Sequence, residues 1–176
     1  MIYNKEQIDL YLKKMEYNDE IKIDYETLCK LQIAHLTHIP YENIDVLNRK
    51  PISLESQDLF DKMIVKQRGG YCFELNGLYS NLLKSLGFNV TNLAGRFIYQ
   101  DGNTRMRLHR ILKIDIDDKS YISDVGVLSE LSRKSLELEI GKVQNDGKCD
   151  YKFEYNPKQE GEYILYQRKP KKDWKQ

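Results

Sequence analysis

The sequence predicts an α+β protein in which an N-terminal helical bundle, residues 1–87, packs on a β-barrel-like antiparallel sheet, residues 88–176. Before residue 87, apolar residues recur every three or four positions, which is typical of amphipathic helices. After it, short segments rich in β-branched and aromatic residues are separated by turn residues, which is typical of antiparallel strands. With 176 residues and 40% hydrophobic content, the chain can bury a core of this kind.

Capping residues and helix breakers mark the ends of the expected helices. Asn4 and Asp24 are N-cap residues that each precede an apolar stripe at helical spacing. Pro40 ends the second helix, and the segments at 40–44 and 51–53 are expected to form a connecting loop. Gly87 is a typical residue just beyond a helix C-terminus. We expect helices at about residues 5–16, 24–38, 57–66 and 72–86.

The second half of the chain predicts strands joined by short turns. We expect these strands at about residues 88–99, 105–116, 120–125, 136–140, 150–155 and 162–166. The turn at residues 117–119 is tight, so the strands on either side of it should pair as a hairpin. This pairing brings Asp124 to within a residue or two of the level of His109. A slip of one residue would put the two side chains on opposite faces of the sheet.

One cysteine lies at a position that favours reactivity. The sequence RGGYCFE at residues 68–74 places Cys72 directly after a glycine pair and at the start of an apolar helical stripe. Gly69 and Gly70 are expected to give the backbone the freedom for a sharp turn. Cys72 would then meet the unpaired N–H groups of a helix N-terminus, which stabilise a thiolate. The alternative is a small, buried and inert cysteine after a helix break.

A histidine and an aspartate complete a set of chemical groups around this cysteine. Cys72, His109 and Asp124 together have the composition of a cysteine-protease-like triad. Cys72 would attack a carbonyl, His109 would hold the thiolate and transfer protons, and Asp124 would orient and charge-stabilise the imidazole. Each residue also has a structural alternative, as a core cysteine, a strand histidine and a turn-end carboxylate.

The remaining composition excludes several classes of protein. The three cysteines are far apart and odd in number, so we expect no disulfide framework and a cytoplasmic, reducing location. His35 and His38 lie near Cys29 without further ligands at metal-binding spacing, so we expect packing or surface roles and no metal. A net charge of +1 and the lack of a long apolar run give no reason to expect nucleic acid or membrane partners.

Four segments in order resemble the arylamine N-acetyltransferase family. The most specific is the nucleophile motif RGGYCFE at residues 68–74, and the three others fall at family-like separations from it. These three are IPYENI at residues 39–44, LHRIL at residues 108–112 and YISDVG at residues 121–126. The resemblance spans about residues 3–126 and agrees with the expected order of helices and strands.

The resemblance implies an acetyltransferase of xenobiotic metabolism that works by a ping-pong cycle. Cys72 would take an acetyl group from acetyl-CoA as a thioester and pass it to an arylamine, arylhydrazine or N-hydroxyarylamine nitrogen. The family also implies that Arg68 and Glu42 form a supporting ion pair near the nucleophile. Its fold joins a helical domain carrying Cys72 to a β-barrel domain carrying His109 and Asp124, with the triad at their junction. A third, C-terminal lid domain usually helps to form the CoA cleft.

Two departures from the family pattern bear on the substrates. Gly126 is expected in the loop that faces substrate and cofactor, but Val127 and Leu128 follow it where the family has an aromatic residue and a second glycine. The smaller Val127 would change how an aromatic amine packs. The chain also ends at residue 176, about where the third domain would begin. The lid domain is therefore expected to be missing, and an oligomeric partner could complete the CoA cleft.

Two other functions remain open from the sequence. The same triad would serve a related amide-forming acyltransferase, or a thiol hydrolase that passes the acyl group to water. The changed loop and short length would also suit a catalytically weak remnant that acts as a binding or regulatory protein. Retention of Cys72, His109 and Asp124 argues against the remnant.

Overall fold

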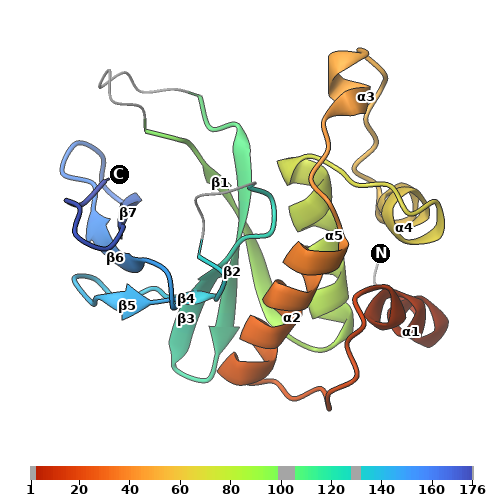
Figure 1. Cartoon of the computed structure of the whole chain (residues 1–176), viewed down its shortest axis with the longest axis horizontal. Helices are drawn as coiled ribbons and strands as arrows, with labels where there is room; N and C mark the ends of the chain where they lie inside the picture. Colours follow the sequence, from red (N-terminus) through yellow and green to blue (C-terminus); the bar gives the residue numbers. More distant parts are fainter. Residues whose placement is uncertain (1–2, 99–105, 128–131, 176) are drawn as a thin grey trace.

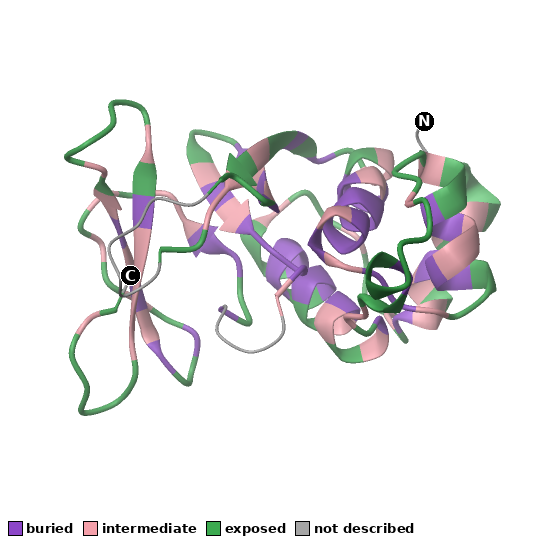
Figure 2. Cartoon of the chain, turned by 90° about the horizontal axis from the view of Figure 1, so that it is seen from above, coloured by how far each residue is buried: buried purple, intermediate pink, exposed green. Residues whose placement is uncertain are grey.

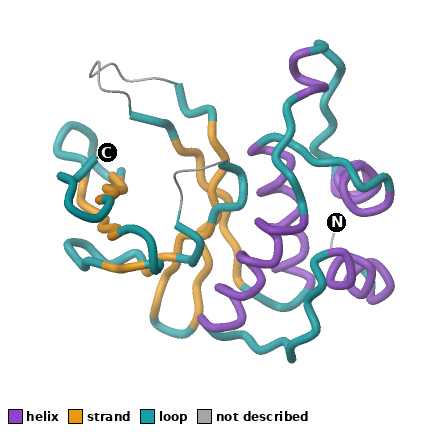
Figure 3. Tube along the Cα trace, viewed as in Figure 1, coloured by secondary structure: helices purple, strands orange, loops and turns teal. Residues whose placement is uncertain are grey.

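The computed structural model describes residues 3–98, 106–127 and 132–175. Helices occupy the first half of the chain and strands the second, as the sequence predicts. The helices gather on one side of a four-stranded sheet, and a second, three-stranded sheet lies on the side away from them (Figure 1, Figure 3). None of the helices in the described ranges is long and apolar enough to cross a membrane.

The first two helices begin at the predicted caps. Helix α1 (Lys5–Lys14) starts with a capping box, in which the Gln7 backbone N–H donates to Asn4 Oδ1 at 2.9 Å and the Asn4 N–H donates to Gln7 Oε1 at 3.0 Å. Helix α2 (Tyr25–His38) starts at Asp24, whose Oδ1 accepts the Thr27 N–H at 2.8 Å. Both predicted helices are confirmed.

The region between α2 and the cysteine contains more helix than the sequence predicts. The expected loop includes a four-residue helix, α3 (Ile44–Leu47), which has no side-chain cap. The helix predicted at residues 57–66 is a short α-helix, α4 (Ser56–Phe60), that continues as a wider π-helical turn, η1 (Asp61–Val65). Helix α5 (Cys72–Ser85) then begins at the cysteine, and Gly87 follows its end with a φ of +100°.

The four-stranded sheet is antiparallel, with the order β1-β2-β3-β4. The predicted hairpin is confirmed, because β2 pairs with β3 through a turn at Asp117, which has a φ of +52°. Each strand is shorter than predicted, and the expected strand residues 99 and 105 lie outside the described residues. The strands are β1 (Asn89–Gly95), β2 (His109–Ile116), β3 (Lys119–Ser123) and β4 (Leu136–Glu137).

The remaining strands form a separate antiparallel sheet with the order β5-β6-β7. Its members are β5 (Gln144–Asn145), β6 (Asp150–Tyr155) and β7 (Tyr163–Arg168). The predicted barrel-like closure is not found in the described part of the chain. The strands instead pair within two sheets, since no described ladder joins β4 to β5.

Two hydrophobic clusters of very different size hold the molecule together. The larger cluster combines residues of the helices with the inward face of the first sheet, including Leu78 and Tyr79 of α5 and Leu112 and Ile114 of β2. The smaller consists of four buried residues from β4, β6 and the chain between them. Buried residues are correspondingly dense where the helices meet the first sheet (Figure 2). The larger cluster crosses residues 87–88, and the two-domain division proposed there stays a prediction.

Candidate active site

Cys72 is the first residue of α5, the position that the sequence predicts. The start of this helix is fixed by Glu74, a buried residue whose Oε2 accepts the Tyr71 backbone N–H at 3.1 Å. Its other oxygen, Oε1, accepts from Lys62 Nζ at 2.8 Å. The thiol therefore lies at a helix N-terminus that is held from two sides, where free N–H groups favour negative charge.

The glycine pair before Cys72 is required for a different reason from the predicted one. Neither Gly69 nor Gly70 is among the described glycines with a positive φ. Both are instead packed too closely for a side chain. A Cβ on Gly69 would lie 2.0 Å from Pro40 O, and a Cβ on Gly70 would lie 2.8 Å from Glu74 Cβ. Gly69 thus lets the chain pass directly against the segment that follows α2, and Gly70 lets it pass directly against the first turn of α5.

His109 and Asp124 meet across the β2–β3 hairpin. Ser123 pairs with Leu112, so the register places Asp124 level with Ile111, two residues from His109. Alternate residues share a face, so the two side chains are diagonal neighbours. His109 Nε2 donates to Asp124 Oδ2, and both residues are buried. The predicted juxtaposition of the two side chains is confirmed.

The environment of His109 favours its charged form. Burial lowers the pKa of the imidazole, but the hydrogen bond to Asp124 and the charges of Asp124 and Cys72 outweigh burial and raise the pKa to about 9. The second ring nitrogen, Nδ1, is buried and has no well-formed hydrogen bond among the described residues. The Cys72 thiol itself points toward the start of the same strand, where it contacts Leu108 O at 3.7 Å.

Gly126 brings the chain after Asp124 against the nucleophile. A Cβ on Gly126 would lie 2.8 Å from Cys72 Cα and 3.0 Å from Cys72 Cβ, so only glycine fits. The Gly126 N–H donates to Asp124 Oδ1 at 2.8 Å. Val127 is partly exposed beyond this contact. Leu128, the second position at which the sequence departs from the family pattern, lies outside the described residues.

Asn76 is a residue that the sequence did not single out. Its Nδ2 donates to Asp124 Oδ1 at 2.8 Å and to Arg110 O at 2.6 Å. The signal in the sequence is a polar residue one turn after Cys72, between the apolar residues Leu75 and Leu78. Such a position predicts a buried amide with specific partners only if the helix is known to pack on polar groups.

The predicted ion pair of Arg68 with Glu42 is present and is part of a larger network. Arg68 also contacts Asp45 Oδ2 at 2.9 Å, and Lys62 lies 3.0 Å from the same oxygen. Lys62 and Arg68 hold the pKa of Asp45 well below its usual range. Because Lys62 also binds Glu74, the network connects α3 to the start of α5.

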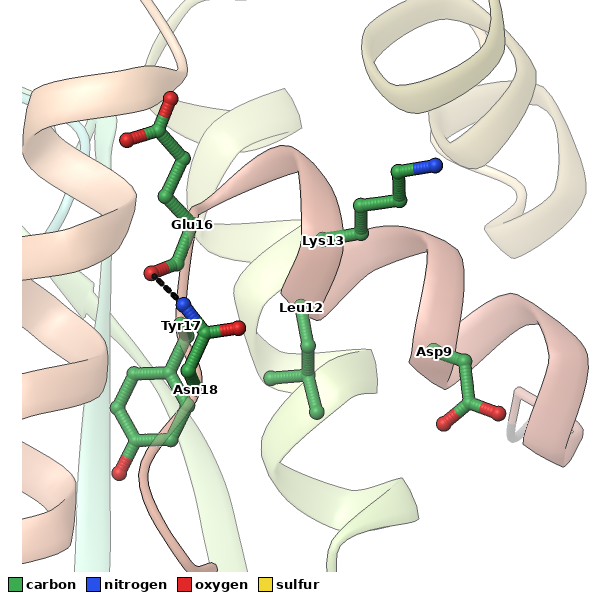
Figure 4. Close-up of a pocket in the computed structure, with 6 residues that line it drawn as sticks. All are labelled: Asp9, Leu12, Lys13, Glu16, Tyr17 and Asn18. Carbon is green, nitrogen blue, oxygen red and sulfur yellow. Dashed lines mark hydrogen bonds between the residues drawn. The ribbon is translucent and has the colours of Figure 1, made fainter.

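Two surface hollows on the helical side of the molecule are lined by none of the residues Cys72, His109 and Asp124. The larger of the two, about 480 Å³, lies at the end of α1 (Figure 4). It is lined by Asp9, Leu12, Lys13, Glu16, Tyr17 and Asn18. The described residues contain no group of three or more His, Cys, Asp or Glu side chains that could hold a metal ion.

The fold and the cluster define the class of protein. A helical unit and an antiparallel sheet hold a cysteine at a helix N-terminus beside a buried histidine–aspartate pair. A family model described as N-acetyltransferase matches residues 24–176 of this chain, which is most of its length.

Related proteins identify the family more closely. The arylamine N-acetyltransferase / N-hydroxyarylamine O-acetyltransferase of Salmonella typhimurium is 37% identical over 150 residues, which cover 85% of this chain and 52% of that protein. The arylamine N-acetyltransferase of Escherichia coli is 32% identical over 144 residues, which cover 81% of this chain and 51% of that protein. The chain belongs to the arylamine N-acetyltransferase family, and it spans about half the length of these curated relatives.

Solved structures agree with this assignment. The Salmonella typhimurium enzyme superposes with a TM-score of 0.88 at 32% identity, covering 98% of this chain and 62% of that chain. The Mycobacterium marinum enzyme in complex with CoA gives a TM-score of 0.86 at 29% identity, covering 95% of this chain and 62% of that chain. The helical unit and both sheets are therefore an arrangement shared with this family.

Proposed function

We propose that this chain transfers an acetyl group from acetyl-CoA, through a Cys72 thioester, to the nitrogen of an arylamine, arylhydrazine or N-hydroxyarylamine. The observation that carries the proposal is the position of Cys72 at the N-terminus of α5, next to the buried His109–Asp124 pair. Family membership supports the acyl chemistry, and a relative solved with CoA supports the donor. Catalysis by a Cys72–His109–Asp124 triad is part of the proposal.

In the first half-reaction, Cys72 and His109 act as a thiolate–imidazolium pair. The raised pKa of His109, about 9, supports a charged imidazole at neutral pH. The thiolate attacks the thioester carbonyl of acetyl-CoA, and N–H groups at the start of α5 stabilise the oxyanion. The carbon–sulfur bond to CoA then breaks. His109 gives its proton to the departing CoA thiolate, leaving an acetylated Cys72 and a neutral imidazole.

The second half-reaction returns the protein to its starting state. The acceptor amine attacks the Cys72 thioester, and neutral His109 takes the proton that the nitrogen loses. The carbon–sulfur bond to Cys72 breaks, and the thiolate and imidazolium re-form together. Asp124 stabilises the imidazolium in both halves of the cycle through its contact with Nε2.

Apolar side chains beside His109 support an aromatic acceptor. The Phe97 ring lies 5.2 Å from the His109 ring and is 48% exposed, and Leu108 is also exposed. Gly126 packs on Cys72 and leads to the partly exposed Val127, which follows the contact with the nucleophile directly in the chain. An aryl group would bury the exposed face of Phe97 and gain from ring stacking.

The unpaired cysteines support a reducing compartment such as the cytoplasm. Cys29 and Cys149 are buried and free, as is Cys72. The supporting role of Arg68 and Glu42 is likewise a proposal, in which the ion pair and Asp45 hold the chain before the nucleophile.

Intact mass spectrometry tests this function in two steps. Incubation with acetyl-CoA should add a single acetyl group that is absent in Cys72→Ser. Addition of an arylamine or arylhydrazine should then discharge the acetylated protein much faster than buffer alone. Discharge at the same rate without amine would support a hydrolase instead. Folded protein that forms no adduct with any short acyl-CoA would rule out the acetyltransferase.

A further inference from the structure

Asn76 is a polar residue in the most deeply buried part of α5. It follows Cys72 by four residues, so the two side chains lie on the same face of the helix, one turn apart. Asn76 is 0% exposed, and the nearby helix residues Leu75 and Leu78 are also buried. A buried amide is destabilising unless its donors and acceptor are satisfied. The partners of Asn76 therefore determine what this residue does.

Three hydrogen bonds satisfy the Asn76 side chain. Nδ2 donates to Arg110 O at 2.6 Å and to Asp124 Oδ1 at 2.8 Å. Oδ1 accepts from the Val125 backbone N–H at 3.0 Å. One side chain thus bonds to two separate strands of the first sheet, at β2 and just beyond the end of β3.

Each of these bonds fixes a group next to a candidate catalytic residue. Arg110 directly follows His109, so the bond to its carbonyl fixes the start of β2 relative to α5. The bond to Asp124 Oδ1 orients the carboxylate so that Oδ2 faces His109. The bond from Val125 fixes the backbone immediately after Asp124.

We propose that Asn76 is a positioning residue that sets the geometry and charge of the Cys72–His109–Asp124 cluster. Asn76 and Gly126 each donate an N–H to Asp124 Oδ1, and the other oxygen, Oδ2, binds His109. In this orientation Asp124 stabilises the His109 imidazolium, which in turn stabilises the Cys72 thiolate. Asn76 acts through Asp124, and this inference rests on the proposed function of the cluster.

Two substitutions remove the hydrogen-bond donors of Asn76 and keep a branched side chain at this position. Asn76→Leu keeps the same branched arrangement of heavy atoms, with bulkier methyl groups, but removes both donors and the acceptor. Asn76→Asp keeps an acceptor for the Val125 N–H and places a second carboxylate beside Asp124. The leucine removes the donors to Asp124 Oδ1 and Arg110 O, and the aspartate sets an oxygen against both acceptors, so both changes should disturb the orientation of Asp124 toward His109. The polar aspartate variant also provides a test if the leucine variant does not fold.

Gln32 offers a matched control. It is 1% exposed and also makes three buried hydrogen bonds, one as donor and two as acceptor. Its Nε2 donates to Ser132 O at 2.9 Å, and its Oε1 accepts from Ser123 Oγ at 2.6 Å and Ser135 Oγ at 2.8 Å. None of these bonds is to Cys72, His109 or Asp124. Gln32→Leu therefore removes three buried hydrogen bonds, including one to Ser123 directly before Asp124, but none that is made to Asp124 itself.

The experiment measures the rate of Cys72 alkylation by iodoacetamide from pH 5 to 10, with the modified peptide identified by mass. Asn76→Leu and Asn76→Asp should lower the rate constant at pH 7 by about tenfold or more. The difference in rate between the unmodified protein and each of these variants should become smaller from pH 7 to pH 10. The alkylation rate constant of Gln32→Leu should stay within about twofold of that of the unmodified protein at every pH, and urea unfolding should show that this variant is also destabilised.

Two results would overturn the proposal. One is an unchanged profile in both Asn76 variants, and the other is an equal loss of rate in Gln32→Leu. Alkylation needs neither acetyl-CoA nor an amine, so failure of this inference is distinguishable from failure of the proposed acetyl transfer. If alkylation behaves as expected but no acetyl adduct forms, the positioning role stands and the substrate assignment falls.

Discussion

The surroundings of His35 and His109 differ in one respect that decides their chemistry. Both histidines are buried, with exposures of 0% and 4%. Both also contact an aromatic ring, at 5.2 Å for Tyr79 beside His35 and 5.2 Å for Phe97 beside His109. Yet burial lowers the pKa of His35 to about 3, whereas the pKa of His109 is raised to about 9.

The difference comes from the partners of the two rings. His35 lies inside the helical core between Tyr11 and Tyr79, and neither of its ring nitrogens has a hydrogen-bond partner among the described residues. Burial alone penalises the charged form. His109 is desolvated as well, but it binds the carboxylate of Asp124. A buried histidine therefore becomes a charged proton donor only where the fold also supplies an anion.

Removing that anion is the strongest test of the comparison. In Asp124→Asn, His109 should be uncharged like His35, because a neutral amide does not stabilise an imidazolium. The rate of Cys72 acetylation by acetyl-CoA should fall by about 10³- to 10⁴-fold, measured as a time course of the mass adduct. His35→Leu, the matched change in the core, should leave the rate within about twofold. Acetylation of Asp124→Asn at the normal rate would contradict the assigned role of Asp124.

The two histidines should also affect stability with opposite dependence on pH. An unfolded chain takes up a proton at His35 below its ordinary pKa near 6.5, but the folded protein does so only near 3. His35 therefore lowers stability as the pH falls from about 6.5 toward 3. The folded protein keeps the proton of His109 up to about pH 9. His109 therefore stabilises the fold fully below about pH 6.5, and this contribution is lost as the pH rises through 9.

Urea unfolding across this pH range measures both slopes. Each single histidine contributes at most about 1.4 kcal/mol per pH unit to the free energy of unfolding. His35→Leu should flatten the acid side relative to the unmodified protein, and His109→Gln should flatten the alkaline side. The prediction fails if His35→Leu flattens the alkaline side and His109→Gln the acid side. It also fails if neither slope changes.

The ion pair outside the cluster should have the smallest effect. Glu42→Gln removes one partner of Arg68, but Asp45 remains 2.9 Å from the same guanidinium. The side chains of Arg68 and Glu42 are 38% and 19% exposed, so solvent screens the pair. We expect the rate of Cys72 acetylation to change by less than about fivefold. A loss as large as that of Asp124→Asn would mean that Glu42 takes part in the chemistry.

Much of this contrast could be read from the sequence, because it depends on local signals. The cap at Asp24 and the stop at Pro40 define the helix that buries His35. The RGGYCFE motif places Cys72 at the start of α5, and the turn after β2 brings Asp124 to His109. The register of that hairpin could be predicted only to within a residue or two, and the pairing of Leu112 with Ser123 determines it.

Features that depend on distant contacts could not be predicted. The four-residue helix α3 has no side-chain cap, and Asp45 within it is held by Lys62 and Arg68. Separation of the strands into two sheets depends on which edges pair, and strand patterns alone do not determine this. Asn76 has no distinctive neighbours in the sequence. Its hydrogen bonds to Arg110 and Asp124 depend on which strands pack against α5.

A titration of the histidine ring signals by NMR tests the central claim most directly. The chain has only three histidines, so substitution of His35 and of His109 assigns their signals. We predict that the His109 signal titrates near pH 9 and that His35 stays neutral until the pH approaches 3. In Asp124→Asn, the His109 midpoint should fall. If His35 and His109 both titrate near 6.5, and Asp124→Asn leaves His109 unchanged, the account of a carboxylate-charged histidine beside Cys72 is wrong.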